Sequence, residues 1–298
     1  MRKTSAALAA LALSAVALTG CSAAPTFAGA PCDRSGSVHG IDEDVSVSGD
    51  LGTEPKVTLV GPLQTKKVSF FDAEAGEGQP LVDENQVFVG AFALYSGETG
   101  EMIQNVGFGD QGQLFTISTI EQGLPDLKLG KALECATGGS RVVVAAPTTD
   151  KGDSVIGVFD IESTMLSRAE GGDVFNDARG VPTVVRNPAD GRPGIIIPDS
   201  KAPTKTVTQT LIAGDGDKVG DDQPFFAYTA VGWNDRKVAE SNWGQLPEAD
   251  LTKLPKQVAA AVQAANVGSQ ILVVVPGEGD AQAVAYVVDI LGSVPASK

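Results

Sequence analysis

The chain has 298 residues, with 37 acidic and 22 basic side chains, a formal charge of −15, three cysteines and one histidine. At roughly 150 residues per domain this length predicts about two domains, and 35 glycines with 17 prolines favour a turn-rich, β-rich fold. The negative charge argues against nucleic acid as a partner, because a phosphate backbone repels such a surface. One histidine is too few for a site built from several imidazoles, and no zinc, phosphate-loop or calcium-loop spacing occurs. We therefore expect no metal and no cofactor.

Residues 1–20 have the pattern of a secretory signal. Arg2 and Lys3 form a basic start, and residues 6–18 form an apolar run that is too short to span a bilayer as a helix. The run ends in Leu18-Thr19-Gly20-Cys21, which resembles a bacterial lipobox, where the cysteine is lipidated and becomes the new N-terminus. Two acyl chains at Cys21 are enough for stable anchoring. This interpretation predicts an extracytoplasmic protein, lipid-anchored to the outer face of the cell membrane; the alternative is an ordinary signal cleaved near Ala24.

The two remaining cysteines, Cys32 and Cys135, are predicted to form a disulfide. An exported protein lies in an oxidising compartment, where an even pair of cysteines favours a crosslink. The alternative is two separate buried thiols. Residues 21–43, which contain Cys32, lack apolar periodicity and are expected to be a flexible spacer from the membrane.

Two stretches, 44–168 and 181–294, are interpreted as two copies of one fold. Landmarks recur between them, namely Pro55–Leu59 with Pro193–Ile197, Gly76–Gly78 with Gly214–Gly216, and Gly139–Val144 with Gly268–Val273. The first two pairs are offset by 138 residues (193 − 55 and 214 − 76) and the third by 129 (268 − 139). Constant offsets at several landmarks indicate an internal repeat.

The strands and the helix expected in each copy follow in the same order. The first copy predicts strands at 57–60, 67–71 and 87–94, and the second at 195–197, 206–212 and 225–231. A short helix is expected over 255–265, because apolar residues recur at helical spacing and Pro255 suits a helix start. Strands 270–275 and 283–291 close the second copy. The predicted fold class is α+β.

The second copy resembles the FKBP-type peptidyl-prolyl cis-trans isomerases. The residues that carry the resemblance are Gly214-Asp215-Gly216, Tyr228-Thr229, Val267-Gly268-Ser269 and Val287-Val288-Asp289-Ile290-Leu291. The tandem arrangement behind a lipobox is similar to the FKBP-type lipoproteins of actinobacteria. The resemblance implies two domains, each a curved antiparallel β-sheet wrapped around one short helix, with an apolar pocket between sheet and helix.

The resemblance also assigns the site. It gives catalytic positions to Tyr228, Glu240 and Tyr286, and substrate-binding positions to Phe226, Trp243, Leu254 and Val258. Glu240 and Trp243 follow from aligning residues 238–243 with the family's Val-Phe-Asp-Ser-Ser-Trp motif. The implied partners are proline-containing segments of exported polypeptides.

Several family features are missing from the second copy. The usual tryptophan at the pocket floor has no aromatic counterpart, and Val258 is one of the two nearest equivalents, with Gln257. The backbone donor at the pocket edge falls on Leu254 or Pro255, and a proline has no N–H to donate. The flap before the last strand is cut down to residues 276–282.

The first copy departs further. The offsets place Gly90 and Gly157 at the two aromatic positions, Gln104 at the acidic position and Leu129 at the floor, which predicts a degenerate domain.

The sequence and the resemblance together lead to two candidate functions. The first is an extracytoplasmic peptidyl-prolyl cis-trans isomerase that assists the folding of exported proteins. The alternative is a non-catalytic peptide-binding chaperone or adaptor with degenerate pockets.

Overall fold

The computed structural model describes residues 25–34, 40–109, 112–125, 128, 130–148, 153–175, 178–188, 190–279 and 281–296. The predicted signal peptide, the predicted lipidation site Cys21 and the expected floor residue Leu129 lie outside the described residues. Among the described residues, no helix combines the length and the apolar character that crossing a membrane requires.

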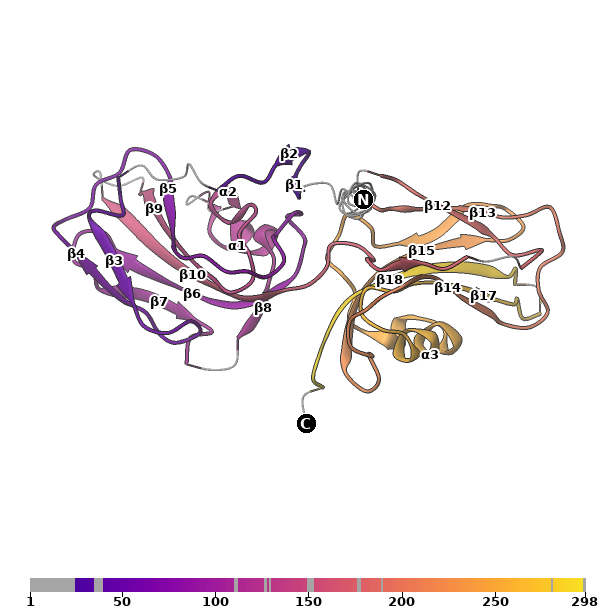
Figure 1. Cartoon of the computed structure of the whole chain (residues 1–298). Coiled ribbons are helices and arrows are strands. Elements are labelled where there is room, and N and C mark those ends of the chain that lie inside the picture. The colour runs from indigo at the N-terminus through magenta and orange to yellow at the C-terminus, as the bar shows by residue number, and fades with distance from the viewer. Residues whose placement is uncertain are drawn as a thin grey trace, which may run out of the picture.

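The first domain is an antiparallel sheet with helices on one face and a hairpin on the other (Figure 1). Its six strands are β5 (Ser69–Glu74), β6 (Phe88–Ser96), β7 (Met102–Val106), β8 (Gln113–Phe115), β9 (Ser140–Pro147) and β10 (Ser154–Thr164). They are ordered β5-β9-β10-β6-β7, and β8 also pairs with β6. The remaining elements are α1 (Ile117–Gly123), α2 (Gly130–Leu133) and the hairpin β3 (Val45–Ser48) and β4 (Lys56–Leu59).

The second domain repeats this plan, as Figure 1 shows in rose, orange and yellow. Its sheet is ordered β11-β14-β17-β18-β15-β16, with α3 on one face and the hairpin β12–β13 on the other. The elements are β11 (Gly172–Asp173), β12 (Thr183–Arg186), β13 (Pro193–Ile196), β14 (Val207–Ala213), β15 (Gln223–Gly232), β16 (Val238–Ser241), the 3₁₀ turn η2 (Leu251–Lys253), α3 (Lys256–Ala264), β17 (Gln270–Val275) and β18 (Val284–Val294). The predicted α+β class is confirmed.

Apolar runs in the central strands explain why both faces of each sheet are covered. Successive side chains of a strand point to opposite faces, so a strand buried on both faces needs an unbroken apolar run. In β17, Ile271 and Val273 pack with α3, whereas Leu272 and Val274 pack with the hairpin β12–β13. The hairpin layer was not expected from the sequence. The first domain also differs from the one-helix expectation, because its helical layer is divided between α1 and α2.

The strand registers show that the two domains are equivalent, and they correct one offset. Asp160 lies opposite Ala91 and Asp289 lies opposite Ala227, so β10 and β18 are offset by 129 (289 − 160) but β6 and β15 by 136 (227 − 91). The offset between the two copies is therefore 138 at Gly76 and Gly214 but 136 at β6 and β15. The connection before β6 is two residues longer than that before β15. Gly90, placed with Tyr228 from the sequence, is instead equivalent to Phe226.

The predicted disulfide between Cys32 and Cys135 is formed. It holds an N-terminal hairpin, β1 (Thr26–Phe27) and β2 (Ala30–Pro31), against the first domain, where Phe27 packs on the helix-side core. The Arg34 guanidinium pairs with Asp72 and donates hydrogen bonds to the carbonyls of Ala132, at 2.9 Å, and Glu134, at 2.6 Å, at the end of α2. Part of the segment expected to be a flexible spacer is therefore structured, because these contacts fix residues 26–34 to the domain.

A buried aspartate occupies the same place in both sheets. Asp160 accepts two hydrogen bonds from Arg141, each 2.6 Å, whereas Asp289 accepts one from the Gln270 amide at 2.7 Å and one from the Ala169 N–H at 2.8 Å. Asp289 is fully buried. Burial raises its pKa to about 6, against the opposing effects of the Ala169 and Gln270 hydrogen bonds and of more distant arginines. The second domain thus holds a carboxylate that takes up a proton at mildly acidic pH.

Replacing Cys32 and Cys135 together by serine is expected to lower the free energy of unfolding of the first domain. The crosslink spans 103 residues, and loop-closure entropy for such a span amounts to about 4–5 kcal/mol. Urea denaturation followed by circular dichroism measures the loss, and dithiothreitol should produce the same loss in the native chain but none in the double variant. A loss below about 1 kcal/mol would contradict a stabilising role for the crosslink.

Replacing Asp289 by asparagine is expected to remove a pH dependence. The pKa of this group is about 6 in the folded protein and 3.8 when unperturbed, so the folded state binds the extra proton between these pH values. The contribution of Asp289 to the free energy of unfolding is therefore largest below pH 4. It falls by about 3 kcal/mol as the pH rises from 4 through 6. Thermal unfolding from pH 4 to 7 should show this fall for the native chain relative to the variant. The exposed Asp221→Asn variant keeps Asp289 and serves as the control, so it should show the same fall as the native chain.

Candidate functional site

The three predicted catalytic residues lie on one face of the second sheet. Ala230 of β15 lies opposite Glu240 of β16 on one side and opposite Tyr286 of β18 on the other. Tyr228 is two residues earlier on β15. Residues that lie opposite each other, or two apart on one strand, share a face. Tyr228 and Tyr286 both belong to the core that α3 covers, so this face is the one toward the helix.

Glu240 is the charged group of this face. It lies exposed on the edge strand β16, whereas Tyr228 is only 4% exposed. Burial and, after it, this carboxylate raise the pKa of Tyr228. Burial and the same carboxylate also raise the pKa of Tyr286. Both phenols therefore stay neutral over the physiological range and can act as hydrogen-bond donors.

Three of the predicted substrate-binding residues form the apolar base beneath the tyrosines. Phe226 and Val258 are fully buried and Leu254 is 6% exposed, and all three pack in the core that contains Tyr228. The Phe226 and Tyr228 rings lie 6.1 Å apart between centroids. Val258 comes from α3, where Val262 follows it one turn later on the same buried face. The helix therefore supplies an aliphatic floor.

The segment before α3 is tied to β15. Phe226 and Glu248 exchange two backbone hydrogen bonds of 2.9 Å, and the Glu248 carboxylate pairs with Lys253 at 2.7 Å. This brings Leu254 into the core. The Leu254 N–H donates to the Leu251 carbonyl at 3.1 Å, and Pro255, the N-cap of α3, has no N–H. The backbone donor expected at the pocket edge is therefore already engaged.

Asn242 is a positioning residue that the sequence did not single out. Its side-chain oxygen accepts the Tyr228 N–H at 2.7 Å, and its amide nitrogen donates to the Phe226 carbonyl at 3.1 Å. With the Asn242 N–H, which donates to the Tyr228 carbonyl at 3.2 Å, these bonds extend the pairing past the end of β16 and hold the part of β15 that carries Tyr228. The signal was available, since an asparagine directly after a strand often bonds neighbouring backbone.

Trp243 does not join the apolar base, although it was predicted to contact substrate. It is partly exposed, and it is absent from the residues that pack on the Tyr228 core. Its indole nitrogen is buried and has no hydrogen-bond partner among the described residues. The structure therefore brings together six of the seven predicted residues and leaves Trp243 beside them.

The equivalent face of the first domain is filled with aromatic side chains. Phe92 pairs with Phe159 as Tyr228 pairs with Val288, so Phe92 and not Gly90 stands at the tyrosine position. Its ring stacks on Phe159 at 5.4 Å and meets Phe115 edge-on at 5.6 Å. Gln104 lies opposite Leu94 as Glu240 lies opposite Ala230. This face thus has neither the phenol nor the carboxylate of the second domain.

Neither of the two best-defined surface hollows of the described residues is lined by Tyr228, Glu240 or Tyr286. One lies between the domains and the other at the turn of the hairpin β12–β13. Within the described part of the chain, no group of three potential metal ligands is found. Because Phe226, Tyr228 and Val258 are buried in one core, the candidate site is a filled apolar face with polar groups at its rim.

Comparisons with known proteins include a distant structural likeness. No protein family matches the chain, and no curated protein matches it. The structure is similar to the crystal structure of the three FKBP domains of wheat FKBP73, with a TM-score of 0.29 and 15% sequence identity. The match covers 76% of this chain and 94% of the wheat chain.

Replacing Glu240 by glutamine is expected to lower the pKa of Tyr228 toward its ordinary value, because the variant removes a negative charge that disfavours the phenolate. The chain has three tyrosines, so their titration can be followed by tyrosinate absorbance. Tyr286 should shift in the same direction and Tyr95 should not, since Glu240 does not act on Tyr95. An unchanged titration curve would show that Glu240 is not coupled to the phenols.

Proposed function

We propose that the second domain is a peptidyl-prolyl cis-trans isomerase acting on proline-containing segments of exported polypeptides. The observation that carries the proposal is the shared face of Tyr228, Glu240 and Tyr286 above an apolar base. Such a face offers neutral phenol donors and one carboxylate beside a surface that excludes water. No nucleophile, metal or cofactor enters the chemistry.

The barrier to rotation about an X-Pro bond, about 18–20 kcal/mol, comes from the resonance that keeps the amide planar. The twisted amide of the transition state has lost this resonance and is less polar along the bond. An apolar surface therefore binds the twisted form better than the planar form, which lowers the barrier. Tyr228 and Tyr286 would hold the peptide carbonyls on either side of the proline, and the Glu240 carboxylate would help to keep both phenols protonated.

The extracytoplasmic, lipid-anchored location belongs to the same proposal. The signal-like residues 1–20 and the lipobox-like Leu18–Cys21 support it, and the disulfide is compatible with an oxidising compartment. The first domain would then stand next to the anchor as a structural or peptide-contacting domain.

A second function is favoured by the filled pocket. Tyr228 is almost fully buried, the Leu254 N–H is engaged, and the floor is an aliphatic Val258. A face of this kind would grip apolar segments without twisting them efficiently, as a chaperone or adaptor does. Suppression of client aggregation without any isomerisation would favour this function over catalysis.

A protease-coupled assay with a proline tetrapeptide tests the isomerase proposal on the chain from residue 21 onward. Tyr228→Phe and Tyr286→Phe should each lower kcat/KM about tenfold, since each removes a hydrogen bond used in the transition state. Tyr95→Phe is the matched control, because it removes the same atom from the first domain, where it donates to the Pro55 carbonyl at 2.6 Å. Catalysis unaffected by both site variants would refute the site, and no catalysis at all would refute the enzyme.

A further inference from the structure

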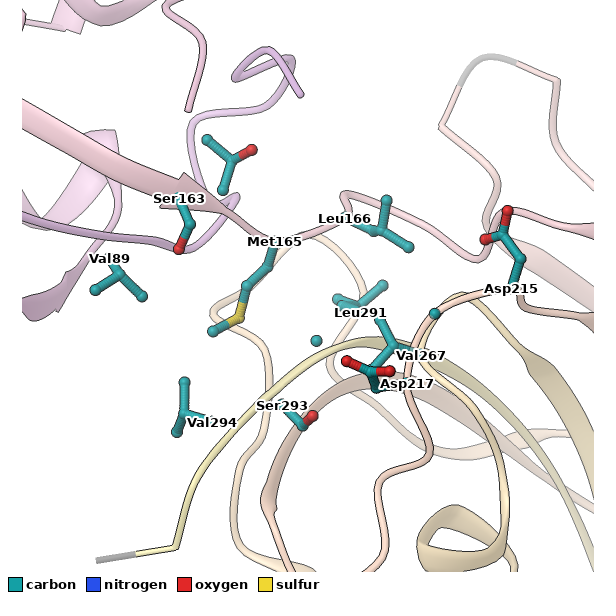
Figure 2. A pocket seen from close by; sticks show the side chains of 13 residues that line it. Val89, Ser163, Met165, Leu166, Asp215, Asp217, Val267, Leu291, Ser293 and Val294 are labelled. Atoms are coloured by element: carbon teal, nitrogen blue, oxygen red, sulfur yellow. The ribbon is translucent and has the colours of Figure 1, made fainter. Parts of the chain in front are cut away.

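A crevice lies where the two domains meet, next to the connecting segment 163–166 (Figure 2). Its volume is about 380 Å³, in the range of ligand pockets, which are common at domain interfaces. One wall comes from β6 of the first domain, another from the connecting segment, and the third from the end of β18 with the loop 215–217. The crevice is separate from the face that carries Tyr228.

Hydrogen bonds across the joint hold the walls in place. The Met165 N–H donates to the Val87 carbonyl at 2.8 Å, and the Leu166 N–H donates to the Leu291 carbonyl at 2.9 Å. One bond is made to each domain, so the connecting segment is fixed to both. Gly292 allows this approach, because a Cβ there would lie 2.8 Å from Cγ of Met165. The crevice is thus preformed by the fold.

The chemistry of the crevice is apolar on its sides and acidic at one end. Figure 2 shows the side chains of Val89, Met165 and Val294 around the hollow, with Asp215 and Asp217 at the end formed by the loop. Both carboxylates are exposed, and in the described part of the chain neither makes an ion pair. No lysine or arginine is among the lining residues. A complementary ligand carries an apolar group next to a positive charge.

We propose that this crevice binds a segment of a partner polypeptide in which an apolar side chain is followed by lysine or arginine. The apolar side chain lies against Met165 and the valines, and the cation lies at the Asp215–Asp217 end. The inference rests on the proposed function only in taking a polypeptide as the partner. It assigns that partner a second contact, which selects basic segments. A second copy of this chain is a poor occupant, because its formal charge is also −15.

Fluorescence polarisation with labelled, capped peptides of glycine and serine tests the proposal. One peptide carries a central Leu-Lys pair, one Leu-Glu and one Gly-Lys, and none contains proline. The Leu-Lys peptide should bind at least about tenfold more tightly than either of the others, since only it matches both the walls and the carboxylates. Its affinity should fall as the salt concentration rises.

Two variants with equal charge change give the matched comparison. The double variant Asp215→Asn with Asp217→Asn should weaken binding of the Leu-Lys peptide about tenfold and remove the salt dependence. The double variant Asp221→Asn with Asp222→Asn neutralises two carboxylates of the same connection outside the crevice, and should change the affinity less than twofold. Ser293→Trp, which places a large ring in the crevice, should abolish binding; circular dichroism checks that it folds.

Three results would overturn the proposal. They are equal affinity for the Leu-Lys and Leu-Glu peptides, no effect of the Asp215 and Asp217 variant, and no binding at millimolar peptide. Sedimentation that showed a dimer dispersed by the same variant would assign the crevice to a second copy instead. Since the peptides lack proline, loss of the isomerase proposal leaves this outcome unaffected, and the tetrapeptide assay is likewise independent of it.

Discussion

Leu272 and Val273 are neighbours on β17, yet one packs toward the hairpin β12–β13 and the other toward α3, and both are fully buried. The same holds for Val143 and Val144 of β9 in the first domain. The central strands of each sheet therefore form an inner layer that is buried on both faces. Apolar burial on both faces is the main favourable term available to these domains, and it dictates where polar groups can stand.

The two buried aspartates show what this constraint demands. A carboxylate in an inner layer needs a partner for each oxygen, because an unpaired buried charge is costly. Asp160 meets this need with Arg141, and the Gly52 N–H adds a bond of 2.7 Å. Asp289 meets it with Gln270 and the Ala169 N–H, which belongs to the connection between the domains. In the second domain, Asp289 thus ties the sheet to the chain that connects the domains. In the first domain, the equivalent Asp160 ties the sheet to the loop of the covering hairpin.

The helix-side face is where the two domains diverge. In the second domain a phenol, a carboxylate and a second phenol meet around Ala230, which is small enough to leave them together. In the first domain Leu94 takes the place of Ala230, and the rings of Phe92, Phe115 and Phe159 fill the space. The same fold therefore carries polar groups on this face in the second domain and an aromatic core in the first. Function is expected to lie with the polar version.

Patterns local to the chain determined much of this. Apolar runs with turns predicted the strands, the spacing of Val258 and Val262 predicted α3, and the repeated landmarks predicted two copies of one fold. The pairing of Cys32 with Cys135 followed from their even number. These features depend on neighbours in sequence, or on compositional logic, so no folded structure was needed to infer them. Of the site, Tyr228 and Tyr286 were predictable, because they lie in or next to the residues that carry the family resemblance, Tyr228-Thr229 and Val287–Leu291.

Features set by contacts between distant segments were decided only by the tertiary structure. The true equivalence of Phe92 with Tyr228 depends on strand register, which a two-residue difference in a connection shifts without any local sign. Three other features likewise depend on segments far apart in the chain. They are the hairpins that cover one face of each sheet, the docking of residues 26–34 and the crevice beside Met165. Hydrophobic periodicity is local, so the chain alone predicted most of the central strands and α3, but not the strands β3 and β12 of the covering hairpins. Which surfaces they bury, and which stay open to a partner, was decided by packing between elements.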